Sequence, residues 1–136
     1  MTRAAVDTSA LLALASSRDQ YHKRALAADA AFRRRGGKWV GTTLVLAELH
    51  GHLIRHLEPQ AARRVISALL ADAAYDWRDA TLELARRASD GWMARFADQR
   101  FSLTRAATFE LMDRERIRHA FAYEQDFVTA GFELLG

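Results

Sequence analysis

The sequence contains no cysteine, one proline and only two lysines in 136 residues. Without cysteine there is no disulfide framework, no thiolate metal site and no thiol nucleophile, which fits a reducing compartment. The sequence also lacks a long apolar run and a flexible linker, and Asp7 interrupts the first residues before a signal segment could form. These absences argue against a transmembrane helix, a secretory signal and a second domain. We therefore expect one cytoplasmic domain over residues 1–136.

The net charge of the chain is small, but its positive charge comes almost entirely from one residue type. Twenty Lys and Arg face seventeen Asp and Glu, for a net charge of +3. Nearly all of the positive charge is arginine, which stays protonated to high pH, so the pI is about 9.8. Half of the residues are apolar and the mean hydropathy is −0.20, values typical of a soluble globular protein.

Short β-like segments alternate with helical ones along the whole chain. The expected strands are 3–6, 38–41, 75–77, 119–123 and 132–135. The expected helices are 8–14, 19–35, 42–57, 59–74, 79–96 and one beginning near Thr104. This alternation predicts an α/β fold, a three-layer α/β/α sandwich with a central, mainly parallel sheet of four to five strands. In such sheets ligands bind outside the carboxyl ends of the strands.

Acidic residues follow two of the expected strands. Asp7 comes directly after the first strand, and Glu124 and Asp126 come after the fourth. Asp7 is either a helix-capping aspartate or a rigidly held ligand for a hard cation. Glu124 and Asp126 are either solvated loop acids or members of the same site.

Glu48 and Asp98 extend this set of acids. Glu48 lies inside an apolar helical stretch, where an ionised carboxylate is costly without a partner such as a metal ion. The alternative is that Glu48 faces solvent or pairs with His52 or Arg55. Carboxylates that converge without thiols favour Mg²⁺ or Mn²⁺ over Zn²⁺, and phosphodiester hydrolysis is the reaction that most needs such a site.

Four segments, in this order, resemble the PIN-domain ribonucleases. They are Asp7–Leu14 (DTSALLAL), Thr42–Leu49 (TTLVLAEL), Asp98–Thr104 (DQRFSLT) and Ile117–Phe127 (IRHAFAYEQDF), the last continuing through Ala130-Gly131-Phe132. The resemblance covers essentially the whole chain and is strongest to the VapC-type toxins of bacterial toxin–antitoxin pairs.

This resemblance implies a PIN fold whose acidic pocket binds Mg²⁺ or Mn²⁺ and cuts single-stranded regions of RNA. It also implies a cognate antitoxin and a homodimer. By position, Asp7 matches the first metal-site aspartate, Glu48 the helix glutamate and Glu124 the last acid, with Asp126 able to share that role. We accordingly predict catalytic roles for Asp7, Glu48, Asp98 and Glu124, and metal ligation by Asp7, Glu48, Glu124 and Asp126.

The sequence departs from the family pattern at Arg105. The family normally places an aspartate after Ser-Leu-Thr, whereas a guanidinium cannot ligate a cation. Asp98 could support a weaker metal site, or Arg105 could swing out or contact the RNA phosphate. The remaining alternative is a catalytically degenerate PIN module that binds antitoxin or RNA without cutting it.

Two further clusters have functional and structural interpretations. Arg33-Arg34-Arg35 is either a solvated helix end that suits the helix dipole or, with Arg105, a phosphate-binding surface for RNA. His52 and His56 have a spacing that can bind zinc, but no third ligand stands at a matching distance, so we expect surface histidines.

Overall fold

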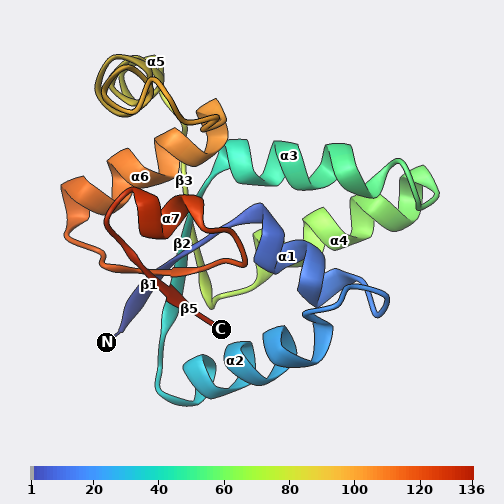
Figure 1. The fold of residues 1–136 in the computed structure, drawn as a ribbon. Coiled ribbons are helices and arrows are strands. Elements are labelled where there is room, and N and C mark those ends of the chain that lie inside the picture. The colour runs from blue at the N-terminus through green and yellow to red at the C-terminus, as the bar shows by residue number, and fades with distance from the viewer. Residues whose placement is uncertain (1) are drawn as a thin grey trace.

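The computed structural model describes residues 2–136, whose five strands form one parallel sheet in the order β3-β2-β1-β4-β5 (Figure 1). The strands are β1 (Arg3–Val6), β2 (Lys38–Thr42), β3 (Tyr75–Arg78), β4 (His119–Phe121) and β5 (Glu133–Leu135). The helices are α1 (Thr8–Ala15), α2 (His22–Arg34), α3 (Thr43–Leu53), α4 (Pro59–Ala71), α5 (Leu82–Arg87), the π-helix η1 (Ala88–Met93), α6 (Leu103–Glu115) and α7 (Asp126–Thr129).

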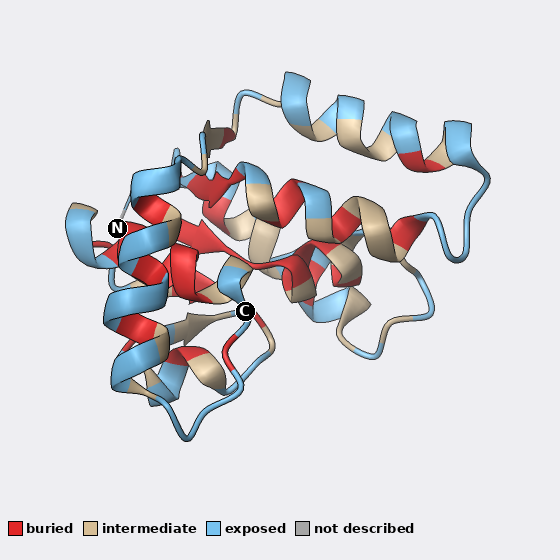
Figure 2. Ribbon diagram, turned by 90° about the horizontal axis from the view of Figure 1, so that it is seen from above, coloured by how far each residue is buried: buried red, intermediate tan, exposed pale blue. Residues whose placement is uncertain are grey.

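Alternate residues of the strands serve two separate cores. On one face, Val6, Trp39 and Phe121 pack with buried residues of α1, α2, α3 and α4. On the other face, Ala5 and Val40 pack with buried residues of α5, η1 and α6. Figure 2 shows this layering as buried strands between helices whose outer faces are exposed. The predicted three-layer α/β/α sandwich with a mainly parallel sheet is therefore confirmed.

The expected helix over 79–96 is interrupted. It begins at Leu82 and widens into the π-helix η1 from Ala88 to Met93. The wider turn buries both Ala88 and Trp92, and the Trp92 indole donates to Glu110 Oε1 at 3.1 Å. The π-helix thus coincides with a contact between Trp92 and Glu110 of α6, which is distant in sequence. The helical periodicity of 79–96 did not predict this widening of the helix.

Two other expected boundaries also differ. The strand predicted over 119–123 ends at Phe121, because the backbone of Tyr123 turns to donate to the Ser9 hydroxyl at 3.0 Å. The short helix α7 then follows, which the sequence pattern did not indicate. No helix within residues 2–136 has the length and apolar character needed to cross a lipid bilayer.

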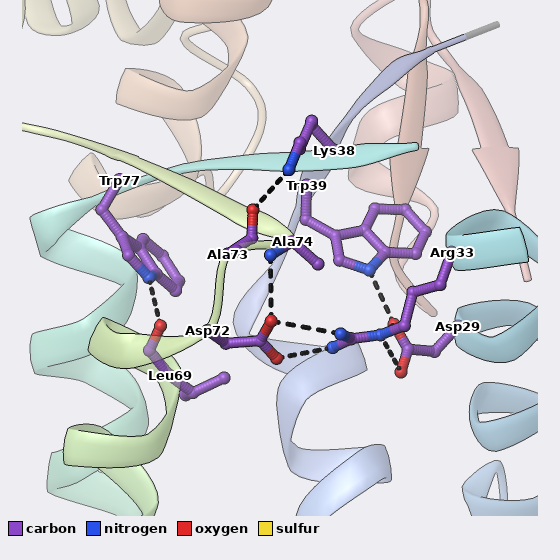
Figure 3. A network of polar contacts seen from close by, with 9 residues as sticks. All are labelled: Asp29, Arg33, Lys38, Trp39, Leu69, Asp72, Ala73, Ala74 and Trp77. Carbon is purple, nitrogen blue, oxygen red and sulfur yellow. Dashed lines mark hydrogen bonds and ion pairs between the residues drawn. The ribbon is translucent and has the colours of Figure 1, made fainter. Parts of the chain in front are cut away.

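A partly exposed polar network links α2 to the turn between α4 and β3 (Figure 3). The Arg33 guanidinium pairs with Asp29 at 3.0 Å and with Asp72 at 2.8 Å. The Trp39 indole donates to Asp29 Oδ1 at 2.7 Å, and Lys38 Nζ donates to the carbonyl of Ala73 at 2.6 Å. Arg33 was a predicted RNA contact, but its guanidinium is already committed to two carboxylates of its own chain.

Asp72→Asn tests the stabilising role of this network. The hydrogen bond from Arg33 holds the pKa of Asp72 below its ordinary 3.8, so the folded state gains stability when this carboxylate is ionised. We expect a loss of about 1 kcal/mol at neutral pH. The loss should shrink as the pH falls below 3.8 and through the lowered folded-state pKa, because protonation removes the same ion pair from the native protein.

Urea unfolding of the native protein and of Asp72→Asn, from neutral pH downward, measures this difference. Asp19→Asn is a matched control, because Asp19 only caps a local turn through Tyr21. A stability difference that does not depend on pH would show that the Asp72 charge contributes nothing.

Candidate active site

The carboxyl ends of β1 and β2 meet the first turns of α1 and α3 at one edge of the sheet (Figure 1). Asp7 stands at this edge, 1 % exposed, directly after β1. Its backbone N–H donates to Phe121 of β4 at 3.0 Å, which ties it to the neighbouring strand. Its carboxylate caps α1 by accepting from the backbone N–H of Ser9 at 3.0 Å. The structure confirms the helix cap, one of the two interpretations that the sequence left open, whereas ligation of a hard cation by Asp7 stays a prediction.

Ser9 fixes the orientation of the Asp7 carboxylate more tightly than a cap alone. The Ser9 hydroxyl donates to Asp7 Oδ2 at 2.5 Å and accepts from the backbone N–H of Tyr123 at 3.0 Å. This hydroxyl therefore joins the loop after β1 to the loop after β4. The sequence predicted no role in the site for Ser9.

Arg105 bridges the acids of the two loops. It lies in the first turn of α6, which Ser102 caps by accepting from the Arg105 backbone N–H at 3.1 Å. Its Nε donates to Asp7 Oδ1 at 3.3 Å and its Nη2 to Asp7 Oδ2 at 3.2 Å. Its Nη1 donates to Asp126 Oδ2 at 2.9 Å. We call Asp7, Arg105 and Asp126 the acid–arginine cluster.

The acid–arginine cluster is partly shielded from solvent. The side chains of Arg105 and Asp126 are 17 % and 30 % exposed. Burial by itself would lower the pKa of Arg105, but the charge of Asp7 and the hydrogen bonds that Arg105 donates to the two carboxylates outweigh it and raise that pKa. Arg105 is therefore a permanent cation between two acids.

The other predicted acids lie outside this cluster. Glu48 is half-buried on α3, and within residues 2–136 its carboxylate takes part in no hydrogen bond or ion pair. Glu124 is exposed in the loop before α7. Asp98 is exposed as well, and the Gln99 amide donates to it at 3.5 Å. Arg105 joins Asp7 and Asp126, whereas Glu48, Glu124 and Asp98 form no hydrogen bond or ion pair with the acid–arginine cluster within residues 2–136, and their roles stay predictions.

The residues in this arrangement do not fit a divalent cation. Both oxygens of Asp7 accept from Arg105, and Oδ2 accepts from Ser9 as well, so few of its lone pairs are free for a metal. No group of three Asp, Glu or His residues in the described part of the chain is spaced to hold a metal. Arg105 supplies the positive charge that the predicted metal would have supplied.

Two buried hydroxyls near Asp7 have no hydrogen-bond partner in the part of the chain that the structure describes. They belong to Thr8, the first residue of α1, and to Thr42, the last residue of β2. Ala5 pairs with Val40 on the neighbouring strand, and Asp7 and Thr42 each come two residues after this pair at the carboxyl ends of β1 and β2. An unsatisfied buried hydroxyl costs free energy that a water or a ligand group can recover, and such hydroxyls are common at functional sites.

The three consecutive arginines at the C-terminal end of α2, Arg33 to Arg35, divide into two kinds. Arg33 is committed to the network of Figure 3, whereas Arg34 and Arg35 are exposed at the end of the helix. Arg35 lies over the ring of Phe32, with its guanidinium carbon 5.6 Å from the ring centre. Arg34 and Arg35 stay predicted RNA contacts, and the sequence could not separate them from Arg33 because the three are adjacent.

Ten chains of solved structures match this chain, two of which are described below, whereas no protein-family model and no curated protein sequence matches it. The crystal structure of VapC20 from Mycobacterium tuberculosis, a sarcin–ricin loop cleaving toxin, is 26 % identical with a TM-score of 0.84, covering 94 % of this chain and 95 % of that one. VapBC2 from Rickettsia felis, bound to a DNA fragment from its promoter, is 10 % identical with a TM-score of 0.66, covering 98 % and 97 %. The second likeness bears on the fold alone.

Proposed function

We propose that this chain, a PIN-domain protein of the VapC type, is a ribonuclease toxin that hydrolyses RNA phosphodiester bonds and is neutralised by a cognate antitoxin. The observation that carries the proposal is the likeness to VapC20, with a TM-score of 0.84 over 94 % of the chain. The acidic edge of the sheet supports it, because Asp7 occupies the place where α/β proteins of this kind bind their ligands.

We assign a different role in RNA cleavage to each of the polar residues at the acidic edge of the sheet. Asp7 is held in one orientation by Ser9, so it can position a water or accept its proton. Glu48 is half-buried and unpaired among the described residues, which leaves it free to act as the second acid–base group. Arg105 donates a hydrogen bond to the RNA phosphate that is attacked. The hydroxyls of Thr8 and Thr42, which have no partner among the described residues, form hydrogen bonds with the bound RNA or with a water.

The likeness to VapC20 also bears on the cofactor and the partners. Toxins of this type generally depend on a divalent metal, and we keep Mg²⁺ or Mn²⁺ as the proposed ion, although the acid–arginine cluster does not fit one while Arg105 bridges it. The exposed Arg34 and Arg35 would hold the RNA backbone through salt-sensitive contacts. We further propose a cytoplasmic homodimer.

Cleavage of RNA by the purified chain tests the function. The substrates are total RNA and a ribosomal RNA fragment that carries the sarcin–ricin loop, each with Mg²⁺, with Mn²⁺ and with EDTA. We expect discrete cleavage products with at least one of the metals, and a loss of cleavage of at least 10-fold in Glu48→Gln. Glu58→Gln is the matched control, because Glu58 is an exposed residue just before α4.

Failure to cut any RNA with either metal, by the native chain and by Arg105→Asp alike, would contradict the nuclease assignment. Cleavage by Arg105→Asp alone would instead identify the native chain as the non-cleaving module, the alternative that the sequence left open.

A further inference from the structure

We propose that Arg105 is an internal counter-ion that closes the acidic edge of the sheet to divalent cations. A cation gains access to Asp7 and Asp126 only when the guanidinium leaves them. The exclusion of the metal is inferred from the geometry of the acid–arginine cluster alone. The further step, that Arg105 thereby regulates RNA cleavage, rests on the proposed function.

The first argument is the occupancy of the carboxylate oxygens. Arg105 makes three hydrogen bonds, at 3.3, 3.2 and 2.9 Å, that engage both oxygens of Asp7 and one oxygen of Asp126. A hard cation at this place needs the same lone pairs at much shorter distances. The guanidinium and the metal therefore compete for one set of ligands.

The second argument is charge. A guanidinium is not deprotonated in proteins, so Arg105, in contact with Asp7 at 3.2 Å and with Asp126 at 2.9 Å, cannot become neutral to accommodate a cation. A divalent ion on Asp7 would lie within a few ångströms of a fixed positive charge in a site where Asp7 is 1 % exposed. Because the guanidinium and the divalent cation repel each other, only one of them can occupy the site beside Asp7 at a time.

The third argument is that Arg105 is able to leave. Its side chain is 17 % exposed, so the guanidinium borders solvent, and leaving also gives up its place over the Phe127 ring, 5.8 Å from the ring centre. The backbone of Arg105 is held separately by the Ser102 cap, so α6 does not need to move when the side chain does. The closed state is thus a side-chain contact that can be broken, not a permanent loss of the site.

Isothermal titration with Mn²⁺ in the absence of RNA tests the proposal. We expect Arg105→Gln to bind Mn²⁺ at least 10-fold more tightly than the native protein. Arg100→Gln is the matched control, because Arg100 is an exposed arginine just before α6 and outside the cluster, and its affinity should equal that of the native protein. Adding Asp7→Asn to Arg105→Gln should abolish the gain.

Arg105→Lys is a second variant in case the Gln variant folds poorly, which far-ultraviolet circular dichroism would show. A lysine ammonium is a point charge that cannot reproduce the two-sided contact of a guanidinium, so we expect a smaller gain in Mn²⁺ affinity. Equal affinities of the native protein and of the folded Arg105 variants would overturn the proposal.

The outcomes for the counter-ion and for the ribonuclease are distinguishable. A gain in Mn²⁺ affinity without RNA cleavage by any variant would support the counter-ion and refute the ribonuclease. Metal-dependent cleavage by the native chain, with the same Mn²⁺ affinity as Arg105→Gln, would support the ribonuclease and refute the counter-ion.

Discussion

Asp7→Asn is expected to lower the rate of RNA cleavage at least 100-fold, which corresponds to about 2.7 kcal/mol of transition-state stabilisation. The variant removes the one buried acid at the carboxyl edge of the sheet, 1 % exposed and held by Ser9. The fold should persist, because asparagine is as good a helix cap as aspartate and can still accept from the Ser9 backbone N–H. Single-turnover cleavage of a labelled RNA, with circular dichroism as the test of folding, measures the effect.

Asp113→Asn is the matched control for this prediction. Asp113 is an exposed aspartate on α6 that lies outside the acid–arginine cluster and has no predicted role in the site. We expect its rate to stay within about two-fold of the native rate, since loss of a solvated surface charge has little effect on a site that it does not contact. Equal losses in Asp7→Asn and Asp113→Asn would contradict the location of the site.

Arg105→Gln is expected to lower the free energy of unfolding by about 2–4 kcal/mol when no metal is present. The substitution leaves the buried Asp7 carboxylate without its cationic partner, and it also frees Asp126. The expected loss lies below that of a fully buried pair because Arg105 is 17 % exposed. Urea unfolding in EDTA measures the loss.

A double-mutant cycle separates the ion pair from other effects of the substitution. Adding Asp7→Asn to Arg105→Gln should restore part of the lost stability, because the carboxylate that was left unpaired is then neutral. A coupling energy near zero would show that the contact between Asp7 and Arg105 contributes nothing to the fold. The control Arg100→Gln should change stability by less than about 0.5 kcal/mol.

The order of elements was predictable because it depends on local pattern. The alternation of apolar strands and helical stretches placed Asp7 after β1 and Glu48 on α3, as observed. The parallel sheet followed from the same alternation. By contrast, the π-helix η1 occurs where Trp92 contacts Glu110, which is 18 residues away in the sequence. Helical periodicity reports only local spacing and cannot predict such a contact.

The pairing of side chains was not predictable in the same way. Asp7 and Arg105 are 98 residues apart, and the sequence indicated only that Arg105 stands where the family places an aspartate, not which acids it contacts. Arg33 and Arg34 look equivalent in sequence, yet only Arg33 meets Asp29 and Asp72. Tertiary contacts therefore decide which charges are free, whereas the sequence decides only which charges exist.

The most direct test of the acid–arginine cluster is anomalous scattering from crystals soaked in Mn²⁺. Crystals of the native protein and of Arg105→Gln would be measured under the same conditions. We predict an anomalous peak beside Asp7 and Asp126 in Arg105→Gln, and in the native protein no peak there while Arg105 bridges the two acids. A peak beside Asp7 in the native protein, with Arg105 still in contact with that carboxylate, would contradict the account.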